Sequence, residues 1–527
     1  MKNIGSLRSF TAASLVAPAL VALALSTTAR AQDTDLAFQN LQAAIENARQ
    51  LVLSEAPTEN TDQAEGFRYV LRRIEHWLQG SGLSDVDTSH PRIYRCPSKV
   101  CKLGFDSPDF VYIAVTPMDD QHDYRVFGKR GTVDLITFQM AEGLGGTETM
   151  TSDDLILDDQ GNWEIIVSPN PQPGNWMQTS AIATGLLIRQ VFSDWDNELE
   201  ASVQVEVLGS AAPPVDVLTP DKCEVGLNRL PLDIFLVPNL FQSLRLGWPE
   251  NDMITPAPGS FGLAGAGFPD NYTSASRYDI APGEAFIIEV DATSTRFHDI
   301  QLGNIWSESL DWASRQVSLN GSQAYLDADN KWRYVLAHTD PGVPNWLDIS
   351  GHEQGGVFMR FLIPDLGDLP TDPVTSLVPI GDVVSMMPPG HPTVTPAERS
   401  AILAARGQVF NRRTNPAGLN LGIDHYQCYK AKDLKNPKFA GVEGVSLEDQ
   451  FGAVVADVKK LASICAPVDK NGEGIRDASQ HQCCYRVKRA KLDPAVNVET
   501  VDQFGTLQAE LKKASTVCLP CTKTVLP

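Results

Sequence analysis

Two stretches near the N-terminus space their apolar residues three and four positions apart. They are residues 35–56, which include "LAFQNLQAAIENARQLV", and residues 62–79, which include "AEGFRYVLRRIEHWL". This spacing gathers apolar side chains on one face of a helix, and no proline interrupts either stretch. We therefore predict two helices within an N-terminal segment, 32–90, each with one face to bury.

Further along the chain the apolar residues alternate with polar ones, which is typical of strands separated by Asp-Gly and Pro-Gly turns. This pattern occurs twice, in a first β unit at 91–215 and a second at 263–363. The resemblance indicates one β unit of about ninety residues written twice. The matching positions are Trp163 and Trp332, Asn175-Trp176 and Asn345-Trp346, and Arg189 and Arg360.

The predicted fold is mainly β. Two such units can bury their apolar faces against each other as a sandwich or jelly roll. The connector between them, 216–262, is expected to form short helices broken at Pro231 and Pro238.

Eight prolines lie between Pro364 and Pro396, so residues 364–395 are expected to form an ordered strap. A helix is predicted at 396–412. Thr395 is placed to cap it, and Glu398 completes the capping box.

The C-terminal module, 420–527, is a second tandem repeat. "HYQCYKAK" is followed by "HQCCYRVK", and "KKLASICAP" by "KKASTVCLP". Short β repeats cannot build a large core and need covalent cross-links. The repeat predicts the pairs Cys428–Cys465, Cys484–Cys518 and Cys483–Cys521, and hence a small disulfide-stapled β tail.

The other cysteines are Cys96, Cys101 and Cys223. Cys96 and Cys101 can close a small loop, which leaves Cys223 without a partner. The tail cysteines with His481 are also compatible with a zinc site, but an oxidising compartment favours disulfides.

Residues 1–31 read as a signal peptide: a basic start, a short apolar run and the small residues "ARA" before the predicted mature start at Gln32. No later run is long enough for a transmembrane segment. We expect an exported protein, periplasmic or extracellular.

The net charge of the chain is −22, and residues 32–414 hold 52 acidic but only 25 basic side chains. Such an acidic surface repels nucleic acids and anionic membranes, so nucleic-acid binding is excluded as a function class. No phosphate-binding loop or other cofactor motif is present, and no cofactor is expected.

Several segments carry a family resemblance: "AEGFRYVL", "GNWEIIVSP", "LLIRQVFSDWD" and above all "AHTDPGVPNWLD…GH…R". The chain resembles exported bacterial proteins of domain-of-unknown-function family 1214 over about residues 60–412. The tail resembles a cysteine-containing repeat module of other exported proteins. The resemblance implies a β-sandwich, but no activity and no catalytic residue.

Polar residues found in only one β unit are the candidates for function, because residues common to both units serve the shared fold. His338, Asp340, Asp348 and His352 occur in the second unit alone. A histidine beside a carboxylate can act as a general base, and Arg360 can stabilise an oxyanion. The same groups suit a divalent metal or, as the plainest alternative, turns that hold their own backbone.

Asp348 and Arg130 are candidate binding residues. Arg130 lies in a basic hairpin that suits either a substrate anion or simple solvation. The leading hypothesis is a non-catalytic envelope protein that binds a small molecule or envelope polymer. The alternative is a hydrolase- or lyase-like enzyme using His338, Asp340, His352 and Arg360.

Overall fold

A computed structural model describes residues 34–80, 87–96, 104–142, 148–209, 217–232, 237–259, 270–414, 426–434, 439–449, 452–468, 481–488, 491–502 and 505–521, with single positions 83, 102, 146, 234 and 268. The predicted signal peptide lies outside these residues. The chain divides into two compact units, 1–414 and 415–527.

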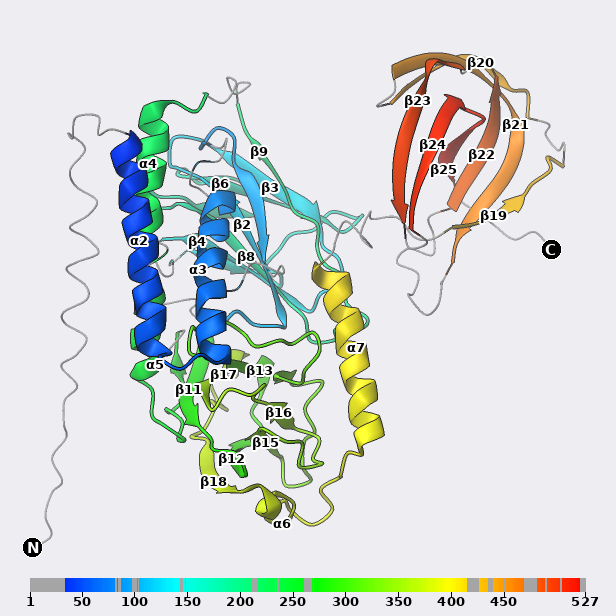
Figure 1. The fold of residues 1–527 in the computed structure, drawn as a ribbon. Helices are drawn as coiled ribbons and strands as arrows, with labels where there is room; N and C mark the ends of the chain where they lie inside the picture. Colours follow the sequence, from blue (N-terminus) through cyan, green and yellow to red (C-terminus); the bar gives the residue numbers. More distant parts are fainter. Residues whose placement is uncertain are drawn as a thin grey trace, which may run out of the picture. The chain divides into compact units, whose positions relative to one another are not determined.

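The predicted N-terminal helices are α2 (Thr34–Glu55) and α3 (Thr61–Gly80). The connector forms α4 (Pro220–Pro231) and α5 (Val237–Leu246), ending and beginning near the predicted prolines. Helix α2 packs against both α3 and α4 (Figure 1). Their shared apolar core includes Leu41, Tyr69 and Leu230.

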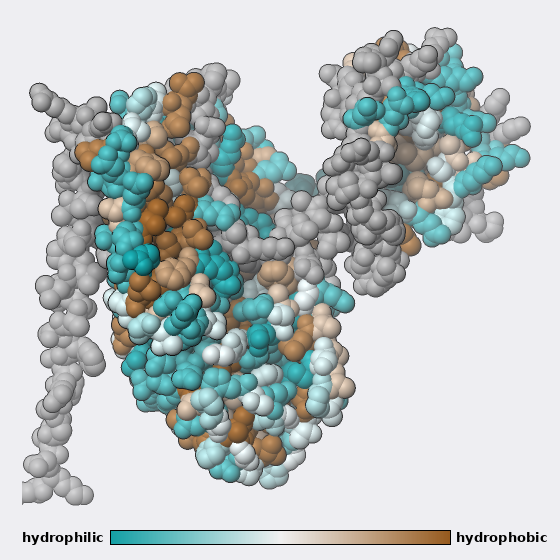
Figure 2. Space-filling view, viewed as in Figure 1, coloured by the Kyte–Doolittle hydropathy of each residue, from teal (hydrophilic) through white to brown (hydrophobic). Residues whose placement is uncertain are grey.

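The helices also leave apolar surface uncovered. Figure 2 shows apolar side chains gathered over α2 and α3, where Phe67 and Leu71 are exposed. In the described part of the chain, no helix combines the length and the apolar character of a membrane span.

The first β unit consists of two antiparallel sheets with one parallel strand pair. Their strand orders are β1-β2-β8-β4-β5 and β7-β6-β3-β9. The strands are β1 (Arg92–Cys96), β2 (Phe110–Thr116), β3 (Tyr124–Lys129), β4 (Leu135–Ala141), β5 (Thr149–Thr151), β6 (Asn162–Ser168), β7 (Trp176–Gln178), β8 (Gly185–Val191) and β9 (Gln204–Val207).

The second β unit repeats this arrangement strand for strand, in the orders β10-β11-β17-β13-β14 and β16-β15-β12-β18. Its strands are β10 (Ala257–Pro258), β11 (Asn271–Asp279), β12 (Glu284–Asp291), β13 (Thr295–Gly303), β14 (Ser318–Asn320), β15 (Lys331–Ala337), β16 (Trp346–Asp348), β17 (Gln354–Pro364) and β18 (Val374–Pro379). The mainly β fold with a duplicated unit is therefore as predicted.

The Asn-Trp pairs shared by the two units make the same hydrogen bonds. The side-chain amide of Asn175 accepts from the backbone N–H of Ile156 and donates to the carbonyl of the same residue. The side-chain amide of Asn345 makes the same two bonds to Tyr325. The indole N–H of each following tryptophan donates to a carbonyl at the end of the neighbouring strand, from Trp176 to Ser168 and from Trp346 to Ala337. These shared residues hold the fold, as predicted.

The layers differ from the expected packing of one unit's apolar face on the other. In each unit the buried apolar side chains of the two sheets face each other, and they belong to one cluster that continues through both units. The two five-stranded sheets then turn their outer faces toward one another, where the rings of Phe110 and Phe297 lie 5.7 Å apart. The same strands serve both layers, because successive side chains along β2 and β4 point to opposite faces of the sheet.

The predicted strap is more regular than expected. It supplies β18 to the second unit and then forms a 3-10 turn (Ile380–Asp382) and α6 (Val383–Met386). Helix α7 (Pro396–Thr414) follows. The predicted capping box is present: Thr395 N–H donates to the Glu398 carboxylate, and Glu398 N–H donates to the Thr395 hydroxyl.

The tail is a separate β module. It contains β19 (Tyr426–Lys430), β20 (Val442–Asp449), β21 (Gly452–Pro467), β22 (His481–Lys488), β23 (Lys491–Asp502), β24 (Gly505–Lys513) and β25 (Thr516–Cys521). All three predicted tail disulfides are present: Cys428–Cys465, Cys483–Cys521 and Cys484–Cys518. Cys96 is also disulfide-bonded, its predicted partner Cys101 lies outside the described residues, and Cys223 is free.

Candidate functional site

The candidate residues around the second-unit loop each have their own structural partner. The His338 imidazole Nε2 lies 2.9 Å from the carbonyl oxygen of Ile280. Asp340 accepts from the backbone N–H of Gly342 and pairs with Arg399 of α7 at 2.9 Å. These contacts close the turn and attach α7. They direct His338 and Asp340 to different partners rather than toward a common substrate position.

Asp348 and His352 are bonded in two further directions. Asp348 pairs with Arg315 at 2.8 Å and accepts from the N–H of Ser350. His352 is buried, and its ring nitrogens lie 2.7 Å from Asp62 and 3.4 Å from Glu65, both on α3. The histidine therefore fastens the N-terminal helix to the second β unit.

The contact between α3 and the second unit continues as a chain of buried polar groups. Asn304 donates to Glu65, and Arg72 pairs with the fully buried Glu308 at 2.9 Å. Lys102, which is half-buried, donates to the carbonyl of Leu310. Burial raises the pKa of Glu308 and lowers that of Lys102, and each neighbouring opposite charge counteracts that effect.

Arg360 lies between the two five-stranded sheets and is buried. Its guanidinium pairs with Asp299 at 3.2 Å and donates to Gln301 at 2.8 Å. Its first-unit counterpart, Arg189, donates to Gln139 at 2.9 Å, but Thr137 stands where Asp299 would be. Arg360 therefore neutralises a buried carboxylate in the interface between the layers.

Arg130 holds its own hairpin. Its guanidinium is half-buried and donates to the carbonyls of Val133 and Asp134 and to the hydroxyl of Ser152. Burial lowers the pKa of Arg130. Both terminal guanidinium nitrogens of Arg130 therefore have partners within the chain.

A buried histidine gives the second unit a pH-dependent stability. Burial lowers the pKa of His298 to about 4, from 6.5 for a free histidine. As the pH falls from 6.5 to 4, the unfolded chain binds a proton that the folded chain does not, so the free energy of unfolding should decrease by about 3 kcal/mol. Urea titrations at pH 7 and pH 4 measure this change.

The first unit supplies the control for His298, since Ile136 occupies the equivalent position in β4. Between pH 7 and pH 4, the free energy of unfolding of the His298→Ile variant should therefore fall by about 3 kcal/mol less than that of the wild type. Identical pH slopes in the wild type and the variant would show that His298 does not titrate differently on unfolding.

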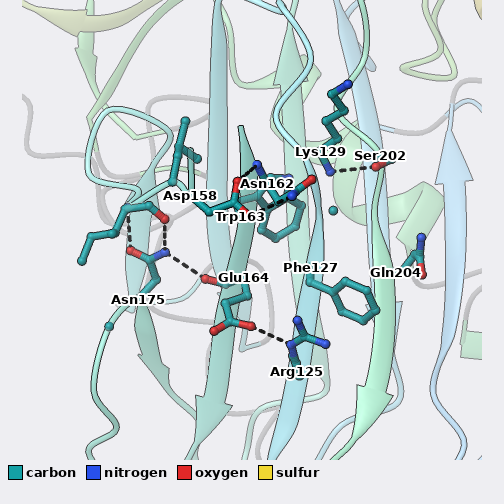
Figure 3. Close-up of a pocket in the computed structure, with 14 residues that line it drawn as sticks. Arg125, Phe127, Lys129, Asp158, Asn162, Trp163, Glu164, Asn175, Ser202 and Gln204 are labelled. Carbon is teal, nitrogen blue, oxygen red and sulfur yellow. Dashed lines mark hydrogen bonds and ion pairs between the residues drawn. The ribbon is translucent and has the colours of Figure 1, made fainter. Parts of the chain in front are cut away.

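A pocket of about 720 Å³ lies on the first unit, at one end of the sheet β7-β6-β3-β9 (Figure 3). Its lining is mixed: charged and amide side chains lie beside an apolar part formed by Phe127, Trp163, Ile156 and Leu157. The indole N–H of Trp163 is buried and has no hydrogen-bond partner among the described residues. The lining residues are Arg125, Phe127, Gly128, Lys129, Ile156, Leu157, Asp158, Asn162, Trp163, Glu164, Gly174, Asn175, Ser202 and Gln204.

Charges of both signs line the pocket. Arg125 lies over the ring of Phe127 and pairs with Glu164 at 2.7 Å and with Glu206 at 3.0 Å. Asp158 accepts hydrogen bonds from Asn162 and from the backbone of its own turn, which lower its pKa and keep it ionised. Figure 3 shows the Lys129 side chain extending away from Asp158 and Glu164.

At the corresponding place in the second unit, the described side chains bond to one another. The cross-strand pair of Phe127 and Glu164 is replaced there by Glu289 and Arg333. The Arg333 guanidinium pairs with Glu289 and with Asp327, the counterpart of Asp158. His391 of the strap lies 2.7 Å from the same Asp327 carboxylate. The chain therefore fills this position with its own side chains.

The strap also covers the rest of that face. Val383 and Met387 pack against Ile287, Val335 and Trp346. On the first unit the corresponding sheet face is open, with Asn162, Glu164 and Gln204 exposed. Sequence reasoning missed this site because it searched for polar residues unique to the second unit. The signal in the sequence that could have found it is a reversal of charge at equivalent positions, with Glu164 in the first unit and Arg333 in the second.

Comparison with known proteins identifies a similar fold and indicates no activity. The chain is similar to an uncharacterised protein from Burkholderia cenocepacia of known crystal structure, with 28% identity and a TM-score of 0.61 over 65% of this chain and 97% of that one. A protein from Vibrio parahaemolyticus matches at 10% identity and a TM-score of 0.36, over 59% of this chain and 96% of that one. No protein-family model and no curated protein matches. The resemblance to family 1214 stays a prediction.

Proposed function

We propose that this chain is an exported, non-catalytic binding protein that holds a polymer of the cell envelope in the first-unit pocket. The observation that carries the proposal is the difference between the two copies. The second unit fills its corresponding position with Arg333, His391 and the strap, whereas the first unit leaves a pocket open there. Its size is within the range of ligand sites.

Two further observations support this assignment. The tail disulfides suit a protein exported to an oxidising compartment. The side chains suggested for catalysis are each engaged in holding a helix or a turn, so a binding role fits better than a hydrolase or lyase. Membership of family 1214 remains part of the proposal.

Purified peptidoglycan is a suitable probe, because it is an envelope polymer that sediments. The full-length protein should co-sediment with it, and Gln204→Trp, which fills the pocket from β9, should reduce the bound fraction about ten-fold or more. Gln178→Trp is the matched control: it lies on β7 in the same sheet, is equally exposed, and does not line the pocket.

Failure to co-sediment, or an equal loss in both variants, would contradict the proposed site. Thermal unfolding of both variants establishes that any loss of binding is not a loss of the fold.

A further inference from the structure

The second unit shows which chemical groups fit the position that the pocket occupies in the first. There, the guanidinium of Arg333 pairs with Asp327, and the imidazole of His391 lies against the other oxygen of the same carboxylate. Both occupants are basic amino-acid side chains, and His391 is presented by a peptide segment that runs over the unit. The edge of the Tyr325 ring contacts the histidine.

The first unit keeps the receiving carboxylate and loses both occupants. Asp158 and Asp327 make the same backbone hydrogen bonds. The N–H of each donates to the carbonyl of the residue four positions later, and the carbonyl of each accepts from the N–H three positions later. Glu164 replaces Arg333, so the strand that supplied a cation now supplies a second anion. Arg125, which pairs with Glu164, is already shared with Glu206.

We propose that the first-unit pocket recognises a basic side chain of a peptide, bound to Asp158 in the way that Arg333 and His391 are bound to Asp327. This inference rests on the proposed function and names the group that its site recognises. An arginine fits this site, since a guanidinium pairs with the corresponding carboxylate in the second unit. Phe127 adds an aromatic ring to the pocket lining, with Arg125 over one face of the ring. The net charge of −22 attracts a cationic ligand toward the protein.

The strap itself provides the probe. Residues 388–394 read PPGHPTV, and we use this heptapeptide with arginine at its fourth position, beside an analogue with glutamine there. The arginine peptide should bind the full-length protein at least about ten-fold more tightly than the glutamine peptide, because only the former makes a charge-assisted hydrogen bond to the carboxylate. Isothermal titration calorimetry at low ionic strength measures both affinities.

Asp158→Asn should weaken binding of the arginine peptide about ten-fold and abolish the difference between the two peptides. Asp159→Asn is the matched control, since it removes the same charge from the neighbouring exposed residue, which does not line the pocket. It should change the affinity by less than about two-fold.

Equal binding of the two peptides, or an arginine peptide unaffected by Asp158→Asn, would overturn the inference. A neutral oligosaccharide of N-acetylglucosamine separates this failure from failure of the proposed function. If that glycan binds and Gln204→Trp prevents it, the pocket is a binding site for sugar and only the inference falls. If neither the peptides nor the glycan nor peptidoglycan binds at the pocket, both fall.

Discussion

Arg360→Met is expected to lower the free energy of unfolding by about 3–5 kcal/mol, because it leaves the carboxylate of Asp299 buried without its counter-charge. Asp299 is fully buried between the two five-stranded sheets, and burial raises its pKa against the opposing effect of Arg360. Urea unfolding followed by tryptophan fluorescence measures the loss.

The duplicated unit provides the control for this substitution. Arg189 is half-buried, desolvation lowers its pKa to about 10, and it makes the same bond to a glutamine. It faces Thr137 rather than a carboxylate. Arg189→Met should therefore cost only about 1–2 kcal/mol, the value of a buried hydrogen bond.

A second substitution tests the cause. In the background of Arg360→Met, Asp299→Asn should restore part of the lost stability, because it removes the unpaired charge and keeps a group that can accept from Ser107. Equal losses for the two arginines, with no recovery in the double variant, would show that the charge of Asp299 is not the reason.

The second large effect is expected in the tail. Each tail disulfide closes a loop of 34 to 38 residues, which corresponds to about 4 kcal/mol of stabilisation through restriction of the unfolded chain. The apolar core of this module is small, with Ala456, Val458 and Val487 as its buried members among the described residues. Removing the bridges should therefore unfold the tail.

Hydrogen exchange on the full-length protein with all six tail cysteines replaced by serine is the suitable measurement. We expect protection to disappear from β19 to β25 and to persist in the β units, which keep the Cys96 bridge. Replacing only Cys428 and Cys465 should weaken protection without abolishing it. Full protection in the six-serine variant would mean that the small core suffices alone.

The features that could be predicted from the sequence have local or repeated signals. Thr395 and Glu398 mark a helix start three residues apart, and the Asn-Trp pairs recur in both units with the same backbone bonds. The tail pairings follow from matching one repeat onto the other. In each case, a short stretch or a comparison of two stretches contains the whole signal.

What the sequence did not reveal depends on contacts between distant segments. His352 is bonded to Asp62, 290 positions away, and nothing near either residue indicates this. The polar groups unique to the second unit looked like candidates for activity because their partners were unknown. Several of those partners lie on α3 and α7, which pack on the second unit, so these groups attach helices instead.

The arrangement of the tail bridges determines how this module responds to mechanical tension. Cys428 and Cys465 lie directly opposite each other on β19 and β21, as do Cys484 and Cys518 on β22 and β25. A force that pulls on the two ends of the module passes through the sulfur atoms and bypasses most of the polypeptide. Only the stretch between Cys465 and Cys483 can lengthen, so the module yields little even when its sheets separate.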